Sequence, residues 1–152
     1  MDNTDKLILT TLQHNGRLSV AEVADQVGLS KTACWRRIQK LEEDGVIDGS
    51  VTLLNKEKLN LGLTVFISIK TNQHNTQWYQ NFCQVVAGIA EVIGVYRMSG
   101  ELDYLIQAVV PDMRGYDALY KRIIEADLHD VSASFVMETI KHTTALPLEH
   151  IN

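Results

Sequence analysis

The chain has 152 residues, of which 45% are hydrophobic and 22% are charged, and its formal net charge is −5. This length suits one ordinary domain or two small ones, and no apolar run approaches the ~20 residues that a membrane helix needs. The negative charge argues against a protein that coats nucleic acid indiscriminately, because non-specific binding depends on neutralising phosphates. We expect a protein that folds in water, carries no secretory signal or membrane anchor, and lies in the cytoplasm.

The cysteines and histidines of the chain do not have the pattern of a disulfide framework, a metal site or a catalytic centre. Cys34 and Cys83 are isolated, which favours reduced structural thiols, and the histidines lack the spacing of metal ligands. A glycine-rich phosphate loop and a nucleophile elbow are missing from the sequence as well. We therefore expect no enzyme, no catalytic residue, no metal and no cofactor.

The N-terminal part of the chain predicts three short helices. Apolar residues recur at helical spacing in 4–16, 19–28 and 30–45, and each segment ends near a glycine. Ser19 and Glu22 have the spacing of a capping box at the start of the second helix. The short glycine-containing turn between the second and third helices is typical of a helix-turn-helix, because glycine allows the tight bend.

The third predicted helix has a basic outer face. Its apolar stripe uses Cys34, Ile38 and Leu41, so its other faces are polar and positively charged in an otherwise acidic protein. A solvated helix face with incidental charges is the alternative interpretation. In a helix-turn-helix, this helix enters the major groove and its side chains reach the base edges. The residues that we assign to recognition of double-stranded DNA are Ser30, Lys31, Thr32, Trp35, Arg36, Arg37 and Lys40.

Individual side chains of this helix have different expected roles. Arg36 can donate two hydrogen bonds to a guanine and Thr32 can contact a thymine methyl group, whereas Arg37 and Lys40 are expected to hold phosphates. For Arg37 an ion pair with a carboxylate on another helix stays open, because the glutamates that follow it are poorly spaced for pairing within the helix. Trp35 either contacts DNA or packs against its own domain.

From Val46 onward, β-branched runs broken by glycines and polar turns predict strands, with two amphipathic helices between them. The expected elements are a linking strand at 46–54, strands at 64–70, 92–98, 103–110 and 131–141, and helices over 78–89 and 111–124. The order β-α-β-β-α-β is that of the ferredoxin-like unit, in which two helices cover one face of an antiparallel sheet. The other face is uncovered in one chain, and dimerisation is the simplest way to bury its apolar residues.

With these elements laid out, the sequence resembles the Lrp/AsnC family of transcriptional regulators over nearly its whole length. In the first half the matching residues are Asp5, Ile8-Leu9, Gly16-Arg17-Leu18-Ser19, Val23-Ala24, Gly28-Leu29-Ser30, Arg37-Ile38, Leu41-Glu42 and Gly45-Val46-Ile47. In the second half they are Gly100-Glu101-Leu102-Asp103-Tyr104-Leu105, Val110-Pro111-Asp112-Met113 and Val136-Met137-Glu138-Thr139-Ile140-Lys141. The pair Cys34-Trp35 and the segment 141–147 look closer to the cysteine-responsive branch of the family than to the leucine regulator.

The resemblance implies a sequence-specific DNA-binding transcriptional regulator whose DNA binding is modulated by a free amino acid, with leucine, methionine and cysteine among the candidates. It also implies a homodimer that assembles into tetramers or octamers, with effector pockets between neighbouring dimers. The expected α+β chain has a (winged) helix-turn-helix domain at 1–48, a linking strand or hinge at 49–61, and a ferredoxin-like amino-acid-binding and oligomerisation domain at 62–152. An amino-acid sensor that acts through protein partners without binding DNA is the alternative.

An amino-acid effector is a zwitterion, so its pocket needs oxygen acceptors for the ammonium group and N–H donors for the carboxylate. Gly100 lets the backbone approach a ligand closely, and Asp103 is the ammonium partner that the family motif suggests. Without the resemblance, an ordinary β-hairpin with Gly100 in its turn is the alternative. The residues that we assign to the effector site are Ser99, Gly100, Glu101, Asp103, Tyr104, Ser132 and Ser134.

Overall fold

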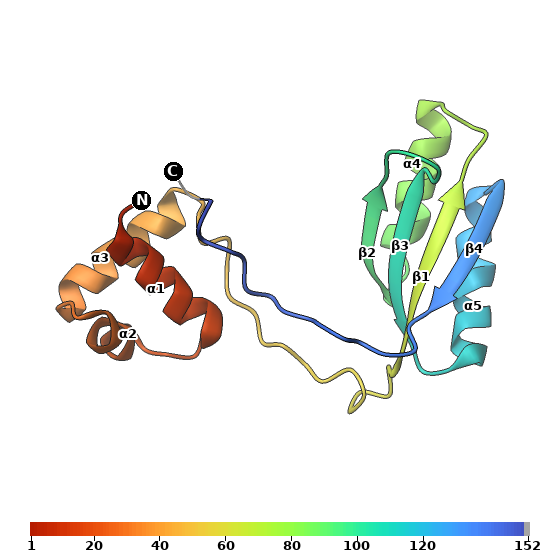
Figure 1. The fold of residues 1–152 in the computed structure, drawn as a ribbon. Coiled ribbons are helices and arrows are strands. Elements are labelled where there is room, and N and C mark those ends of the chain that lie inside the picture. The colour runs from red at the N-terminus through yellow and green to blue at the C-terminus, as the bar shows by residue number, and fades with distance from the viewer. Residues whose placement is uncertain (151–152) are drawn as a thin grey trace. The chain divides into compact units, whose positions relative to one another are not determined.

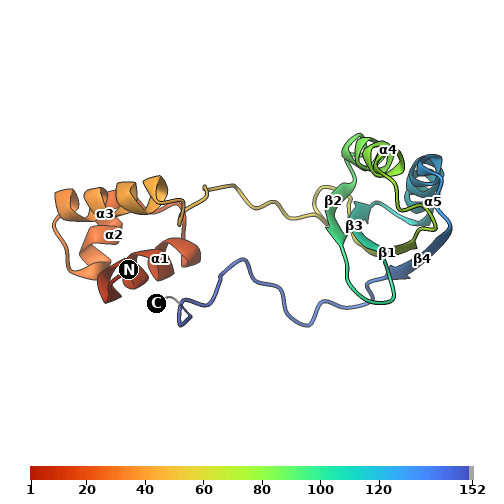
Figure 2. The same ribbon diagram turned by 90° about the horizontal axis from the view of Figure 1, so that it is seen from above.

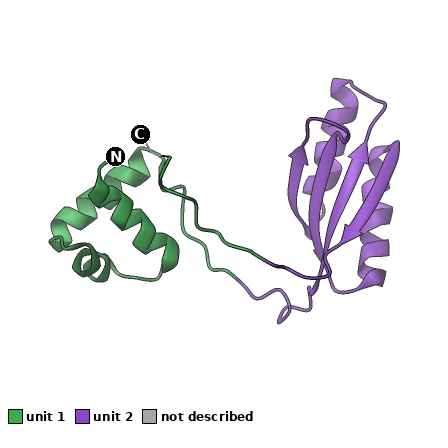
Figure 3. Ribbon diagram, in the orientation of Figure 1, with its two compact units in different colours: residues 1–53, 141–152 green, residues 54–140 purple. Residues whose placement is uncertain are grey.

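The structure, a computed structural model that describes residues 1–150, separates into two compact units (Figure 3). One unit contains residues 1–53 together with the described residues from Lys141 onward, and the other contains Leu54–Ile140. Each unit has a hydrophobic core of its own. Residues 141–150 therefore belong with the N-terminal helices and not with the sheet.

Three helices form the first unit, as the apolar spacing predicted: α1 (Asn3–His14), α2 (Val20–Val27) and α3 (Lys31–Glu43) (Figure 1). The first helix starts at Asn3, slightly earlier than the predicted segment 4–16, and Asp2 caps it. The N–H of Asp5 donates to Oδ1 of Asp2 (2.8 Å), and the N–H of Asp2 donates to Oδ2 of Asp5 (3.1 Å). This reciprocal pair satisfies two backbone donors at the helix start.

The turn between α2 and α3 has the geometry that the helix-turn-helix pattern predicted. Gly28 ends α2 in the left-handed region with φ of 70°, where a residue with a Cβ would be strained. The capping box of Ser19 and Glu22 is present at the start of α2, and the hydroxyl of Ser30 accepts a hydrogen bond from the start of α3. The core between the helices consists of Ile8, Leu9, Val23, Ala24, Cys34, Ile38 and Leu41.

Two residues of the described C-terminal segment, Leu146 and Leu148, also contact these helices. The side chain of Gln13 in α1 donates to the carbonyl of Leu146 (3.2 Å) and accepts from the N–H of Leu146 (2.6 Å). Leu148 packs against the core of the three helices. The sequence patterns gave no indication of this docking, because it joins residues far apart in the chain.

The linking strand predicted at 46–54 is wrong, since this segment forms no strand in the structure of residues 1–150. A strand needs a neighbour for its backbone N–H and C=O groups, and none of the described strands pairs with this segment. Val51 and Leu54 in this segment are exposed, at 83% and 70%, whereas Ile47 packs against the core of the three helices. A β-branched composition does not make a strand where the chain supplies no partner.

The second unit has the predicted β-α-β-β-α-β order. Its elements are β1 (Leu63–Lys70), α4 (Thr76–Ala87), β2 (Val92–Arg97), β3 (Tyr104–Val110), α5 (Met113–Ile123), a short 3-10 helix (Ile124–Ala126) and β4 (Asp130–Phe135). The strand order is β2-β3-β1-β4 and every neighbouring pair is antiparallel. Helices α4 and α5 lie on the same face of the sheet (Figure 2).

The last strand is shorter than the predicted 131–141. Phe135 pairs with Val65, and the N–H of Val136 still donates to the carbonyl of Thr64 (3.0 Å). Beyond this point β1 offers almost no further backbone, because it begins at Leu63. The prediction is therefore wrong at this end: a strand stops where its neighbour stops.

The two faces of the sheet differ in burial. Val65, Ile67 and Ile69 of β1 are fully buried under the helices, together with Ile106 of β3, and Tyr104 of β3 is buried beside them. The alternating residues point to the other face, where the strand register brings together Phe66, Ser68, Leu105, Gln107, Ser132 and Ser134. No helix of the unit covers that face (Figure 2). The predicted uncovered sheet face is thus present.

Candidate DNA-binding helix and effector site

The outer side of α3 carries most of the residues predicted to read DNA. Cys34 and Ile38 lie in the core, and burial raises the pKa of the Cys34 thiol. Trp35 is 51% exposed, so it is not part of the core of its own unit. The exposed members of the predicted set are Ser30, Lys31, Thr32, Trp35, Arg36 and Lys40.

Arg37 is different, because its guanidinium is held by α1. Its Nη1 donates to Oδ2 of Asp2 and to Oδ1 of Asp5, both at 2.7 Å. These hydrogen bonds raise the pKa of Arg37, and the pKa of Asp2 is lowered by the backbone N–H of Asp5 and then by Arg37. The ion pair with another helix, left open by the sequence, is the arrangement that the structure shows.

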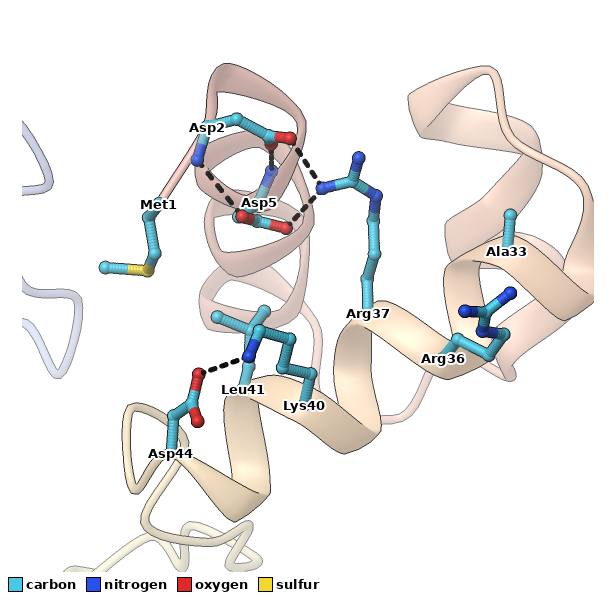
Figure 4. A pocket seen from close by; sticks show the side chains of 9 residues that line it. All are labelled: Met1, Asp2, Asp5, Ala33, Arg36, Arg37, Lys40, Leu41 and Asp44. Atoms are coloured by element: carbon cyan, nitrogen blue, oxygen red, sulfur yellow. Dashed lines mark hydrogen bonds and ion pairs between the residues drawn. The ribbon is translucent and has the colours of Figure 1, made fainter.

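These groups border an open hollow of about 620 Å³ beside α3 (Figure 4). Arg37 extends toward the start of α1, whereas the neighbouring Arg36 points away from that cluster. Lys40 pairs with Asp44 at 3.3 Å, but both side chains are more than half exposed, so this contact contributes little. The charged residues that line the hollow are Asp2, Asp5, Arg36, Arg37, Lys40 and Asp44.

The loop between β2 and β3 contains the predicted effector segment. Gly100 has φ of 113°, a conformation that favours glycine, and nothing lies within 4 Å of the position that a Cβ would take. The carboxylate of Asp103 accepts the N–H of Thr71 (2.8 Å), and the N–H of Asp103 donates to the carbonyl of Ile69 (2.9 Å). Asp103 thus joins this loop to the end of β1, which gives it a structural task whether or not it binds a ligand.

The predicted effector residues do not converge on one pocket within a single chain. Tyr104 is buried on the helix side, with its ring centroid 4.7 Å from that of Phe82. Ser132 and Ser134 lie on the opposite, uncovered face. Glu101 pairs with Lys70 (3.1 Å) at the surface, and its side chain is 86% exposed. A pocket that used all of these residues would need a second subunit.

Sequence reasoning missed Arg97, a cation close to this segment. It is the register partner of Tyr104 in the β2–β3 pair and lines an open cavity of about 250 Å³. The other residues of this cavity are Gln73, His74, Asn75, Thr76, Trp78, Tyr79 and Tyr104. An arginine beside polar groups is suited to a carboxylate. Pairing the two predicted strands residue by residue would have found it.

Comparison with known proteins identifies the family. A model described as the Lrp/AsnC ligand binding domain matches residues 64–146, and a winged helix-turn-helix DNA-binding model matches residues 1–48. The chain belongs to the Lrp/AsnC family. The family resemblance in the sequence is thereby confirmed, and so is the α+β fold class with its winged helix-turn-helix and its four-stranded antiparallel sheet.

Relatives cover almost the whole chain. The DNA-binding transcriptional activator DecR of Escherichia coli is 46% identical over 151 residues, covering 98% of this chain and 99% of DecR. The glutamate uptake regulatory protein of Zymomonas mobilis is 47% identical over 149 residues, covering 97% of this chain and 91% of that protein.

Solved structures of similar proteins also match over the whole chain. An AsnC family regulator from Agrobacterium tumefaciens has a TM-score of 0.95 at 52% identity, with 100% of both chains covered. A transcriptional regulator from Neisseria meningitidis, solved as a complex with L-Met, has a TM-score of 0.94 at 36% identity, covering 100% of this chain and 99% of that one.

The Lrp/AsnC protein described here is a DNA-binding transcriptional regulator with an amino-acid ligand-binding domain. Its family consists of regulators and not of enzymes. Among residues 1–150, no helix is both long and apolar enough to cross a membrane.

Proposed function

We propose that this Lrp/AsnC protein reads specific double-stranded DNA sites through α3 and changes its DNA affinity when its second unit binds a small free amino acid. The observation that carries the proposal is the exposed basic face of α3 in a chain that also holds an Lrp/AsnC ligand-binding domain. Because such a regulator acts on the chromosome, its place of action is the cytoplasm of a bacterial cell.

For DNA recognition, Arg36 is the proposed reader of a guanine and Thr32 of a thymine methyl group, with Ser30, Lys31 and Trp35 beside them. Lys40 is the proposed phosphate contact. The exposure of all six side chains supports this assignment. Arg37 is left out of the contact set, because its guanidinium already binds two carboxylates.

For the effector, cysteine is the first candidate, since Cys34-Trp35 and the segment 141–147 resemble the cysteine-responsive branch of the family. Methionine and leucine follow. One similar regulator was solved as a complex with L-Met, and another, 34% identical over 151 residues, is a leucine-responsive regulatory protein. The proposed pocket uses the segment from Ser99 to Tyr104, with Asp103 for the ammonium group and Arg97 for the carboxylate. Ser132 and Ser134 can contribute only from a neighbouring subunit.

For assembly, we propose a homodimer that covers the free sheet face, with dimers associating into tetramers or octamers. Phe66 and Leu105 on that face are only partly buried, and a monomer leaves them beside water. Sedimentation of the full chain should show a dimer or larger species at micromolar concentration, and Leu105→Arg should shift it toward the monomer. A wild-type monomer would contradict the proposal.

A thermal-shift screen of the twenty amino acids, followed by gel shifts with and without the effector, tests the proposed function. A ligand held at 100 times its Kd stabilises the folded protein by about 2.7 kcal/mol, which a melting curve detects. The alternative, a sensor that acts through protein partners, predicts a thermal shift but no salt-dependent DNA binding.

A further inference from the structure

Asp2, Asp5 and Arg37 form a cluster, here called the Asp–Arg clamp, that joins the start of α1 to the middle of α3 (Figure 4). Each carboxylate uses both of its oxygens. One oxygen accepts a backbone N–H in the capping box, and the other accepts Nη1 of Arg37. The capping hydrogen bonds therefore fix the orientation in which the carboxylates meet the guanidinium.

The charge of the clamp sets what it can do near DNA. Two carboxylates on one guanidinium leave a local charge of about −1, which repels phosphate. The clamp lines the same hollow as Arg36 and Lys40, the proposed reader and the proposed phosphate contact. An acidic cluster beside these cations weakens the attraction to the phosphates, which is the same for any DNA sequence. The base-specific hydrogen bonds of Arg36 do not depend on that attraction to the same extent.

We propose that Asp2 and Asp5 are positioning residues for DNA recognition. They hold Arg37 against α1 and so fix the position of α3 relative to α1. They also keep Arg37 from contacting DNA phosphates. The consequence is a lower affinity for random DNA and a larger preference for the specific site. This inference rests on the proposed role of α3, and the rival role for Arg37 is a direct phosphate contact.

The test compares Asp2→Asn/Asp5→Asn, Arg37→Met and the triple variant with the wild type. Asparagine keeps one oxygen for the capping hydrogen bond but turns an N–H₂ group toward Arg37, so the clamp opens while α1 stays capped. The control Glu91→Gln/Asp117→Asn changes the net charge equally in the second unit, where these residues pair with Arg122 and Lys121. The single Asp2→Asn variant replaces the double one if the latter melts early.

Binding is measured against salt on two duplexes of equal length, one selected from a random pool by the wild type and one of random sequence. Opening the clamp should free Arg37 and steepen the salt slope on random DNA by about one unit, a further ~3.5-fold change in affinity between 50 and 200 mM salt. The triple variant should lose this increase, and the control should resemble the wild type. Arg37→Met should reduce the preference for the selected duplex without flattening the slope.

Two outcomes would overturn the proposal. If Arg37→Met flattened the salt slope by about one unit relative to the wild type, Arg37 would be a phosphate contact. If Asp2→Asn/Asp5→Asn left the salt slope on random DNA unchanged, the clamp would not hold Arg37 away from the phosphates. A wild type that shows no preference for any selected duplex would instead reject the proposed function of α3. The two failures are therefore distinguishable.

Discussion

Replacing Asp103 by alanine and by asparagine separates its structural task from its proposed task in effector binding. The carboxylate accepts the N–H of Thr71 at 2.8 Å, and Thr71 is only 8% exposed. Alanine leaves that N–H without an acceptor, which costs about 1–3 kcal/mol. In a domain of this size each kcal/mol lowers the Tm by roughly 4–8 °C. Asparagine keeps an acceptor oxygen and should cost less than alanine.

Effector binding should depend on the negative charge of the Asp103 side chain and not on its acceptor oxygen alone. If Asp103 holds the ammonium group, both variants lose effector binding, although only alanine strongly lowers the Tm. Calorimetry with the amino acid found in the screen measures the binding, and thermal melts of the full chain measure the stability. Undiminished binding by Asp103→Asn would remove Asp103 from the pocket. An unchanged Tm for Asp103→Ala would refute the structural role.

Four further changes test the first unit. Arg36→Ala should weaken binding to the selected duplex by about 1–3 kcal/mol and relax preference at one base pair, whereas Lys40→Ala should weaken all DNA alike and flatten the salt slope by about one unit. Ending the chain before Leu146 should lower the Tm, because the side chain of Gln13 then loses its hydrogen bonds to the carbonyl and the N–H of Leu146. An unchanged Tm would show that this contact contributes nothing to stability. The pKa of Asp2 is lowered from 3.8 in the folded state, so its stabilising contribution is present above that pH and is lost as pH falls through the lower folded value. Melts between pH 7 and 3 should therefore show a smaller acid loss for Asp2→Asn than for the wild type.

Local patterns in the sequence predicted the helices and the sheet because the residues that decide them are close in the chain. Ser19 and Glu22 mark the start of α2, and Gly28 supplies the left-handed residue of the turn. Alternation along β1 separated the buried Val65 and Ile67 from the open face. Each of these signals acts over a few residues, so no tertiary information is needed to use it.

The features that sequence reasoning missed depend on partners far away in the chain. The strand expected at 46–54 has no described neighbour, and the final strand ends at Phe135 because β1 does. For Arg37 the sequence left a phosphate contact and an ion pair with another helix both open, because the spacing of its own helix cannot show that Asp2 and Asp5 lie opposite it. Such contacts follow from the packing of whole elements and not from a local pattern.

The most direct test of regulation by an amino acid is a DNA-binding titration of the wild type on its selected duplex, at fixed salt, with and without the amino acid that raises its Tm. Coupling between two sites usually changes affinity about 5–150-fold, so the account predicts a shift of that size in Kd on the selected duplex. Binding that is equal on selected and random duplexes, or a Kd that stays the same with the effector bound, would contradict it.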